Sequence, residues 1–299
     1  MHPFETRAAS KIAKETEKEK ETSLGTMSCP SCLLGSVDDG TPTGKEMVVA
    51  GVPTYRALPE SGVSDHAILI MTDLFGWKLP NARIVADKIA ELGYQVYVPD
   101  LFNGDPVPSD TLDFVAFPAP SFFGRVFQFF KLLYRIPWLI FWLRRHGAKT
   151  TYPIALRVCE GLRDPSYGIK KIAAQGYCYG GIFSILLAAS GKVDAFLSIH
   201  SAAPKDAELQ QIACPGCFLN AKDDMSFPAK KIEHVKQLLA LKTKENPALT
   251  FRFKEYPDVP HGFAIRGDPR KPQIAKARAE ALQDAVDYVQ SLFGKPALG

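Results

Sequence analysis

The sequence has little excess charge of either sign, and this limits the partners that it can bind. Its 299 residues carry 36 Lys and Arg against 32 Asp and Glu, a net charge of +4. Residues 117–149 contain six basic residues and no acidic one, so the remainder of the chain sums to −2 (+4 minus +6). Nucleic-acid-binding proteins carry a broader basic surface. We therefore expect no nucleic-acid partner.

The beginning of the chain lacks the apolar run of a secretory signal. Residues 1–26 are polar, with five Lys or Arg and five Glu, and mitochondrial presequences are poor in acids. A disordered tail is the preferred interpretation. The six cysteines of the chain are then expected to be reduced thiols, because disulfides are rare in reducing compartments. These features favour a cytoplasmic location.

The sequence also lacks a glycine-rich phosphate-binding loop. Two Cys-x-x-Cys pairs, Cys29/Cys32 and Cys214/Cys217, have the spacing of zinc or redox sites. The second pair enters a predicted core strand, which favours buried, inert thiols over metal ligands. We therefore expect neither a metal nor a cofactor.

Short apolar runs alternate with amphipathic stretches from residue 45 to residue 299, after a tail and irregular lead-in over residues 1–44. The patterns predict strands near 46–51, 52–57, 67–71, 94–98, 171–177, 195–199, 217–220 and 251–256. They predict helices near 81–92, 181–189, 230–241 and 272–293. This alternation is typical of one α/β domain, with a mostly parallel sheet that is covered by helices on both faces.

One aromatic insertion interrupts this alternation at about residues 117–147. It holds ten of the 32 aromatic residues of the chain. Its apolar stretch, residues 126–143, includes Lys131, Arg135 and Pro137, which argue against a membrane span. Three interpretations stay open: a helical lid over the active site, an interface between copies of the chain, or an element that lies on a membrane surface.

The strongest chemical signal is the motif Gly176-Tyr177-Cys178-Tyr179-Gly180-Gly181. It follows an apolar strand and precedes a helix of small residues, which is the setting of a nucleophile elbow. A helix N-terminus favours a thiolate at Cys178, and the N–H of Tyr179 is then an oxyanion donor. The alternative is a buried structural cysteine beside a packing turn.

The residues that follow Cys178 favour catalysis. α/β-Hydrolases place the nucleophile first, then the acid, then the histidine. Here one predicted strand ends before Asp223-Asp224, and the next ends before His261, so all three side chains are expected at the carboxyl edge of the sheet. The histidine would exchange a proton with the thiol, and the aspartate would orient the imidazole. We expect a structural role for His200 and a solvated one for His234.

The chain resembles the dienelactone hydrolase (carboxymethylenebutenolidase) family, especially its fungal-type branch. The motifs that carry the resemblance run in order from about residue 45 to 295: Asp73-Leu-Phe-Gly76, Asn81-Ala-Arg83 with Ala86-Asp87, Pro99-Asp100-Leu-Phe with Gly104-Asp105, Gly176 to Gly181, Asp224-Met-Ser-Phe-Pro228, and His261-Gly-Phe-Ala264.

The resemblance implies an α/β-hydrolase fold, with Cys178 as nucleophile and His261 and Asp224 as its partners. Asp224 is preferred over Asp223 because the family places its acid four residues before the proline.

The resemblance also assigns roles around the nucleophile. The N–H of Leu74 is implied as the second oxyanion donor. Asp73 stands where the family usually has a glutamate that helps to set the protonation of the thiol. Arg266 lies close to the position of a family arginine that binds the substrate carboxylate, offset by one residue. Asp73 and Arg266 are therefore expected to bind substrate or to tune the thiol.

These observations predict an enzyme that hydrolyses a small ester or lactone through an acyl-enzyme. Two alternatives stay open. The protein is a non-catalytic or membrane-associated scaffold on the same fold, or it uses the same residues for acyl transfer or ring closure in a biosynthetic pathway. The expected partner is a small-molecule ester or lactone, with membrane-surface or homo-oligomer contact through residues 117–147 as a further alternative.

Overall fold

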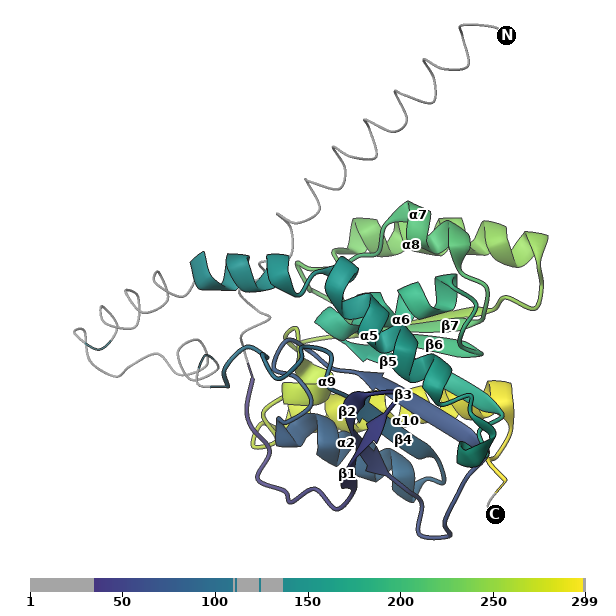
Figure 1. The fold of residues 1–299 in the computed structure, drawn as a ribbon. Coiled ribbons are helices and arrows are strands. Elements are labelled where there is room, and N and C mark those ends of the chain that lie inside the picture. The colour runs from purple at the N-terminus through teal and green to yellow at the C-terminus, as the bar shows by residue number, and fades with distance from the viewer. Residues whose placement is uncertain (1–34, 110, 112–123, 125–136, 298–299) are drawn as a thin grey trace, which may run out of the picture.

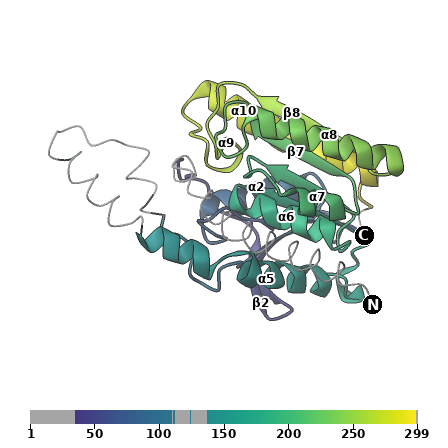
Figure 2. The same cartoon turned by 90° about the horizontal axis from the view of Figure 1, so that it is seen from above.

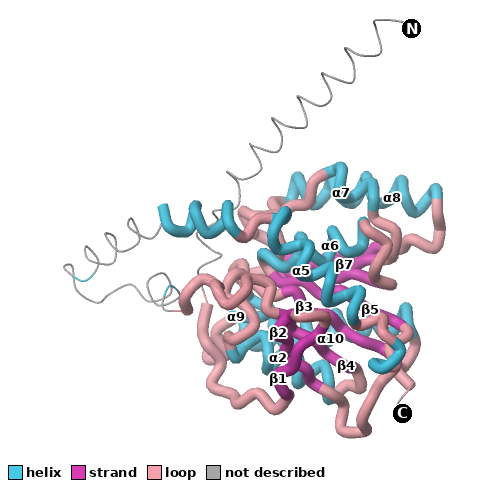
Figure 3. The backbone as a smooth tube through the Cα atoms, in the orientation of Figure 1, coloured by secondary structure: helices cyan, strands magenta, loops and turns pink. Residues whose placement is uncertain are grey.

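The computed structural model describes residues 35–109, 111, 124 and 137–297. These residues form an eight-stranded sheet in the order β1-β2-β4-β3-β5-β6-β7-β8 (Figures 1 and 3). The strands are β1 (Lys45–Val49), β2 (Val52–Ala57), β3 (His66–Met71), β4 (Gln95–Pro99), β5 (Lys171–Tyr177), β6 (Ala195–Ile199), β7 (Gly216–Ala221) and β8 (Phe251–Tyr256). The β1–β2 and β2–β4 pairs are antiparallel, and every pair from β4 to β8 is parallel.

Helices cover both faces of this sheet (Figures 1 and 2). One face packs against α5 (Ala148–Gly161), α6 (Tyr179–Ala189), α7 (Asp206–Gln211) and α8 (Ala229–Glu245). The other packs against α2 (Pro80–Glu91), α9 (Phe263–Arg266) and α10 (Pro272–Phe293). The central strands β3 and β6 are buried along their whole length, as expected for parallel strands covered on both sides. The predicted α/β architecture is thus confirmed.

The predicted elements agree closely with the structure, and the misses are short or irregular helices. Strands β6 and β8 and helix α10 begin and end at the predicted residues. Three helices were not predicted: α5, α7 and α9. Helix α5 adjoins the aromatic insertion and contains Pro153, which obscures its period, and α7 and α9 are too short to show one.

The lead-in and the aromatic insertion are each described only in part. Residues 35–44 have no regular secondary structure. Residues 137–145 of the aromatic insertion are helical, and most of residues 117–136 lies outside the described part. Within the described ranges, every helix is too short or too polar to cross a bilayer. The lid, interface and membrane-surface interpretations of the insertion stay predictions.

Candidate active site

A strained turn between β5 and α6 carries Cys178. Its backbone has φ 52° and ψ −113°, a conformation that is costly for a residue with a Cβ and that marks functional turns. Two glycines allow this turn to pack closely. A Cβ on Gly176 would collide with the backbone of Gly180, and a Cβ on Gly180 would collide with the carbonyl of Met71. The motif therefore places the thiol at the N-terminus of α6, above the carboxyl edge of the sheet.

Cys178, His261 and Asp224 form a continuous hydrogen-bonded array at this edge. The Nε2 of His261 lies 3.0 Å from Sγ of Cys178, and its Nδ1 lies 2.6 Å from Oδ2 of Asp224. Each residue follows the end of a different strand, namely β5, β7 or β8. The histidine and aspartate side chains are each 1% exposed. Asp223 is exposed, so the structure places Asp224, and not its neighbour, against the imidazole.

The charges of this array favour a protonated histidine. Burial by itself lowers the pKa of His261, but the adjacent sulfur of Cys178 and the carboxylate of Asp224 outweigh burial and raise this pKa to about 10. Burial raises the pKa of Asp224, but its hydrogen bond and charge interaction with His261 produce a net lowering. The geometry thus suits an imidazolium that lies between a thiolate and a carboxylate.

A second buried ion pair adjoins the sulfur. The Nε of Arg266 lies 2.6 Å from Oδ2 of Asp73, and the two side chains are 0% and 1% exposed. The other oxygen of Asp73 accepts from the N–H of Phe75 at 3.0 Å. Burial raises the pKa of Asp73; Arg266 lowers it, Cys178 raises it further, and the net direction is upward. Because the guanidinium of Arg266 is fully buried, a role in setting the protonation of the Cys178 thiol is favoured over a role in binding substrate.

Two backbone N–H groups, those of Leu74 and Tyr179, are predicted to be the oxyanion donors. Tyr179 is the first residue of α6, and Leu74 lies in the loop after β3. Hydrogen bonds from Gly76 to the carbonyl of Asp73 and from Val107 to the carbonyl of Leu74 hold this loop. Within the described ranges, neither Leu74 nor Tyr179 donates its N–H to another residue. Both N–H groups are therefore available to a ligand.

Sequence reasoning missed two residues beside His261. The N–H of Ser226 donates to Oδ1 of Asp224 at 2.8 Å, and its Oγ lies 3.4 Å from Nδ1 of the histidine. Its place two residues after the acid was a usable signal. His200 is fully buried, and its ring packs edge-on against that of His261 at 5.2 Å between centroids. Burial holds the pKa of His200 well below its usual value, so it stays neutral. The side chain of His234 is 43% exposed and pairs with Asp206 at 2.9 Å, as expected for a solvated histidine.

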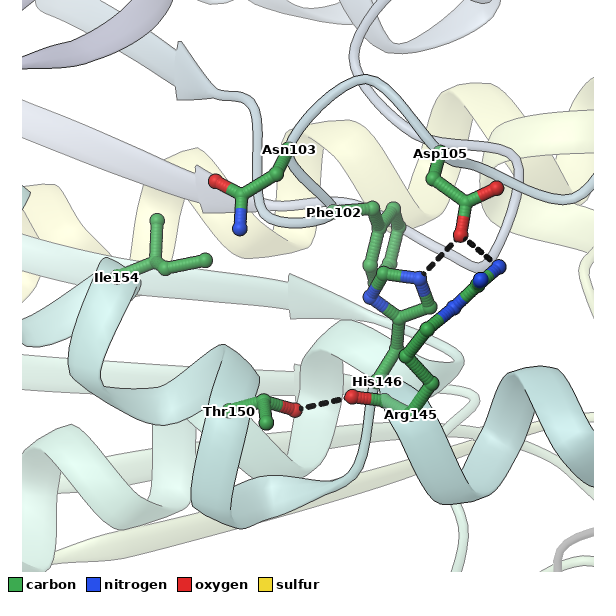
Figure 4. Close-up of a pocket in the computed structure, with 7 residues that line it drawn as sticks. All are labelled: Phe102, Asn103, Asp105, Arg145, His146, Thr150 and Ile154. Atoms are coloured by element: carbon green, nitrogen blue, oxygen red, sulfur yellow. Dashed lines mark hydrogen bonds and ion pairs between the residues drawn. The ribbon is translucent and has the colours of Figure 1, made fainter.

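The end of the aromatic insertion is anchored beside the nucleophile. Oδ2 of Asp105 pairs with Arg145 and, at 2.6 Å, with Nε2 of His146 (Figure 4). These residues line a cavity of about 370 Å³ together with Phe102, Asn103, Thr150 and Ile154. The hydroxyl of Tyr179 donates to the carbonyl of His146. The insertion therefore contacts the residue that follows Cys178 in the sequence.

The described residues contain no cluster of side chains suited to hold a metal ion. Cys214 and Cys217 are buried free thiols, and burial raises the pKa of each to about 12. This agrees with the inert-thiol interpretation of that pair. Cys29 and Cys32 lie outside the described residues.

Comparisons with known proteins agree on one family. The sequence model described as "Dienelactone hydrolase family" matches residues 52–120 and 144–294, and the gap between the two matched ranges lies within the aromatic insertion. The hydrolase tropI of Talaromyces stipitatus is 31% identical over 269 residues, which cover 89% of this chain and 96% of that protein. The carboxymethylenebutenolidase homolog of Mus musculus is 26% identical, covering 87% and 97%.

A solved structure agrees on the fold. The putative dienelactone hydrolase from Klebsiella pneumoniae superposes with a TM-score of 0.59 at 17% identity, covering 82% of this chain and 98% of that one.

Proposed function

The chain belongs to the dienelactone hydrolase family, and from this premise we propose that it hydrolyses a small ester or lactone with Cys178 as nucleophile. The observation that carries the proposal is the array in which 3.0 Å separates sulfur from imidazole and 2.6 Å separates imidazole from carboxylate. This is the geometry that an activated nucleophile, a proton-transfer group and an orienting acid require.

Acylation begins when the thiolate of Cys178 attacks the carbonyl carbon of the substrate. The carbonyl oxygen becomes an oxyanion, which the N–H groups of Leu74 and Tyr179 stabilise. The C–O bond to the leaving group then breaks, and His261 gives its Nε2 proton to the departing alkoxide. In a lactone the alcohol that leaves stays attached to the acyl group, so the whole substrate remains on the sulfur as a thioester.

Deacylation reverses the role of the imidazole. Once the thiolate has become a thioester, the anion that raised the pKa of His261 is gone, so the neutral ring accepts a proton from water. The resulting hydroxide attacks the thioester carbonyl, and the carbon–sulfur bond breaks. The carboxylic acid leaves, and the thiolate–imidazolium pair is restored. Asp224 holds the imidazole in the required orientation through both steps.

The test compares activated esters and unsaturated lactones as substrates for the wild type and Cys178→Ala. Loss of the nucleophile is expected to reduce kcat/KM by about 10³-fold or more, because the remaining groups contribute only modest acceleration. Cys214→Ala is the matched control, since it removes a buried thiol that precedes β7, at the opposite end of that strand from Asp224, and it is expected to retain activity. Equal turnover by the wild type and Cys178→Ala would refute the proposal.

Product analysis shows which molecule accepts the acyl group from the thioester, water or an added nucleophile. Hydrolysis gives only the free acid when alcohols or amines are added, whereas acyl transfer gives their esters or amides. Mass spectrometry of the products, with and without an added nucleophile, therefore separates a hydrolase from an acyl-transfer enzyme that uses the same thioester.

A further inference from the structure

Helix α9 links His261 to Arg266, yet it is too short to be stable alone. It spans four residues, Phe263–Arg266, and begins directly after His261-Gly262. A single turn of helix is unstable without tertiary contacts, because nucleation is costly. Its contacts must therefore fix where the guanidinium of Arg266 lies.

Asn81 supplies one of these contacts from the start of α2. Its side chain is fully buried, and its amide nitrogen donates at 2.9 Å both to the carbonyl of Ile265 and to that of Ser36. Its amide oxygen accepts from the N–H of Asp38 at 3.2 Å. One side chain thus joins α2, the lead-in and α9, although Asn81 and Ile265 are 184 residues apart in the sequence. A buried polar group with every atom paired in this way fixes a local geometry.

The lead-in makes a second contact with α9. The N–H of Ser36 donates to the carbonyl of Arg266 at 2.8 Å. Gly35 has φ +151°, and a Cβ there would lie 2.5 Å from Cβ of Arg266, so only glycine fits against the arginine. An ion pair between Asp38 and Arg278 anchors the same segment to α10. The lead-in is therefore packed on the backbone of Arg266 itself.

The position of Arg266 matters for the sulfur through Asp73. The preceding residue, Thr72, packs closely on the turn of Cys178, since a Cβ on Gly180 would lie 2.5 Å from its carbonyl oxygen. Asp73 is buried, pairs with the guanidinium at 2.6 Å, and repels negative charge on Cys178. In a buried site such repulsion is only weakly screened. If Arg266 shifts, Asp73 is less well compensated and a thiolate next to it becomes less favourable.

We propose that Asn81 and lead-in residues 35–38 form a clasp that positions Arg266 against Asp73 and thereby sets the thiolate fraction of Cys178. The inference rests on the proposed function, since it concerns the same sulfur. Asn81 is on this view a positioning residue that acts through α9. Five charged or titratable groups lie around the sulfur: His261 with its partner Asp224, Tyr179, and Asp73 with its partner Arg266. Of these, the clasp contacts only Arg266.

The experiment measures alkylation of Cys178 by iodoacetamide between pH 4 and 10 in the full-length protein, with modified cysteines identified by mass spectrometry. Asn81→Leu removes the amide without adding charge, and Gly35→Ala presses on Arg266 directly. In both variants the pH at which alkylation is half-maximal is expected to rise by about 0.5 to 1 unit. Below that pH, alkylation slows three- to tenfold, while the rate at high pH stays as in the wild type.

Tyr55→Phe is the matched control. The hydroxyl of Tyr55 holds the other end of the lead-in by accepting from the N–H of Gly44 and donating to Asp87, each at 2.6 Å. Its loss loosens residues 43–44 without touching α9, so the half-maximal pH should match that of the wild type. Burial raises the pKa of Cys159, Cys214 and Cys217 to about 12, so these thiols stay protonated over the pH range, and their alkylation reports unfolding within each sample.

An unchanged half-maximal pH in Asn81→Leu and Gly35→Ala, or an equal shift in Tyr55→Phe, overturns the clasp. If either clasp variant fails to fold, Asp38→Asn replaces it, because it weakens the pair with Arg278 from the edge of the clasp and the same shift is expected. Alkylation uses no ester, so the clasp can fail while hydrolysis still depends on Cys178. Conversely, the shift can be present when Cys178→Ala leaves hydrolysis intact.

Discussion

Two clusters of charged side chains lie at the carboxyl edge of the sheet, and they differ in their access to water. In the inner cluster, Asp73 and Arg266 are 1% and 0% exposed. In the outer cluster, which anchors the aromatic insertion, Asp105 and Arg145 are 41% and 47% exposed. Both combine a carboxylate, an arginine and a histidine. Charge interactions are strong where water is excluded and weak where it is not, so similar side chains are expected to have very different effects.

The two histidines provide the largest expected contrast. His261→Asn in the inner cluster removes the proton-transfer group and is expected to lower kcat/KM by about 10²- to 10⁴-fold. His146→Asn in the outer cluster removes the ring that pairs with Asp105 and packs against Phe102 and Trp142, and it keeps the carbonyl that accepts from Tyr179. Activity should therefore change less than about threefold. Steady-state hydrolysis of an activated ester measures both. Comparable losses of activity in the two variants would contradict the difference that we expect between the inner and the outer cluster.

The two aspartates provide the next contrast, in stability. Asp73→Asn leaves the buried guanidinium of Arg266 without its counter-charge and is expected to lower the free energy of unfolding by about 3–5 kcal/mol. Asp105→Asn breaks partly exposed pairs and should cost at most about 1 kcal/mol. Urea denaturation of both variants checks the difference. A cost at Asp105 as large as that at Asp73 would mean that solvent exposure does not govern these pairs.

A smaller effect is the pH dependence of stability. The pKa of His261 is raised in the folded protein to about 10, so its contribution is complete below the unfolded value near 6.5 and is lost as pH rises through 10. The pKa of Asp224 is lowered, so its contribution is complete above the unfolded value near 3.8 and is lost as pH falls. The stability difference between the wild type and an Asp224→Asn/His261→Asn variant should therefore be largest between about pH 4 and 6.5.

Urea titrations of both proteins from pH 3 to 10 provide this measurement. A difference that instead grows from pH 7 to 10 would contradict the charge state assigned to His261.

Local patterns were sufficient for much of the fold. The apolar run of β6, the alternating pattern of β8 and the period of α10 predicted those elements to the residue, because strands and long amphipathic helices show their environment in the sequence. The order of Cys178, Asp224 and His261 predicted three side chains at one sheet edge, and the structure brings them together. Their catalytic roles stay predictions until activity is measured.

What the patterns missed depends on contacts between distant parts of the chain. Nothing near Asn81 shows that its amide binds the carbonyl of Ile265, and nothing near Arg266 shows that its partner is Asp73. His200 looked structural because it precedes both candidate acids, yet the fold packs it against His261. Such pairings follow from strand order and helix docking, which one sequence without homologues does not reveal.

The clasp also has a consequence for biosynthesis. Ser36 and Asp38 leave the ribosome early, whereas their partners Arg266 and Arg278 are made almost last. Chains are synthesised from the N-terminus at about 5–20 residues per second, so the lead-in waits on the order of ten seconds or more for α9 and α10. Cys178 is synthesised within that interval, before the groups that complete its surroundings. A reactive thiolate is therefore expected only in the finished protein, which spares the nascent chain from premature modification.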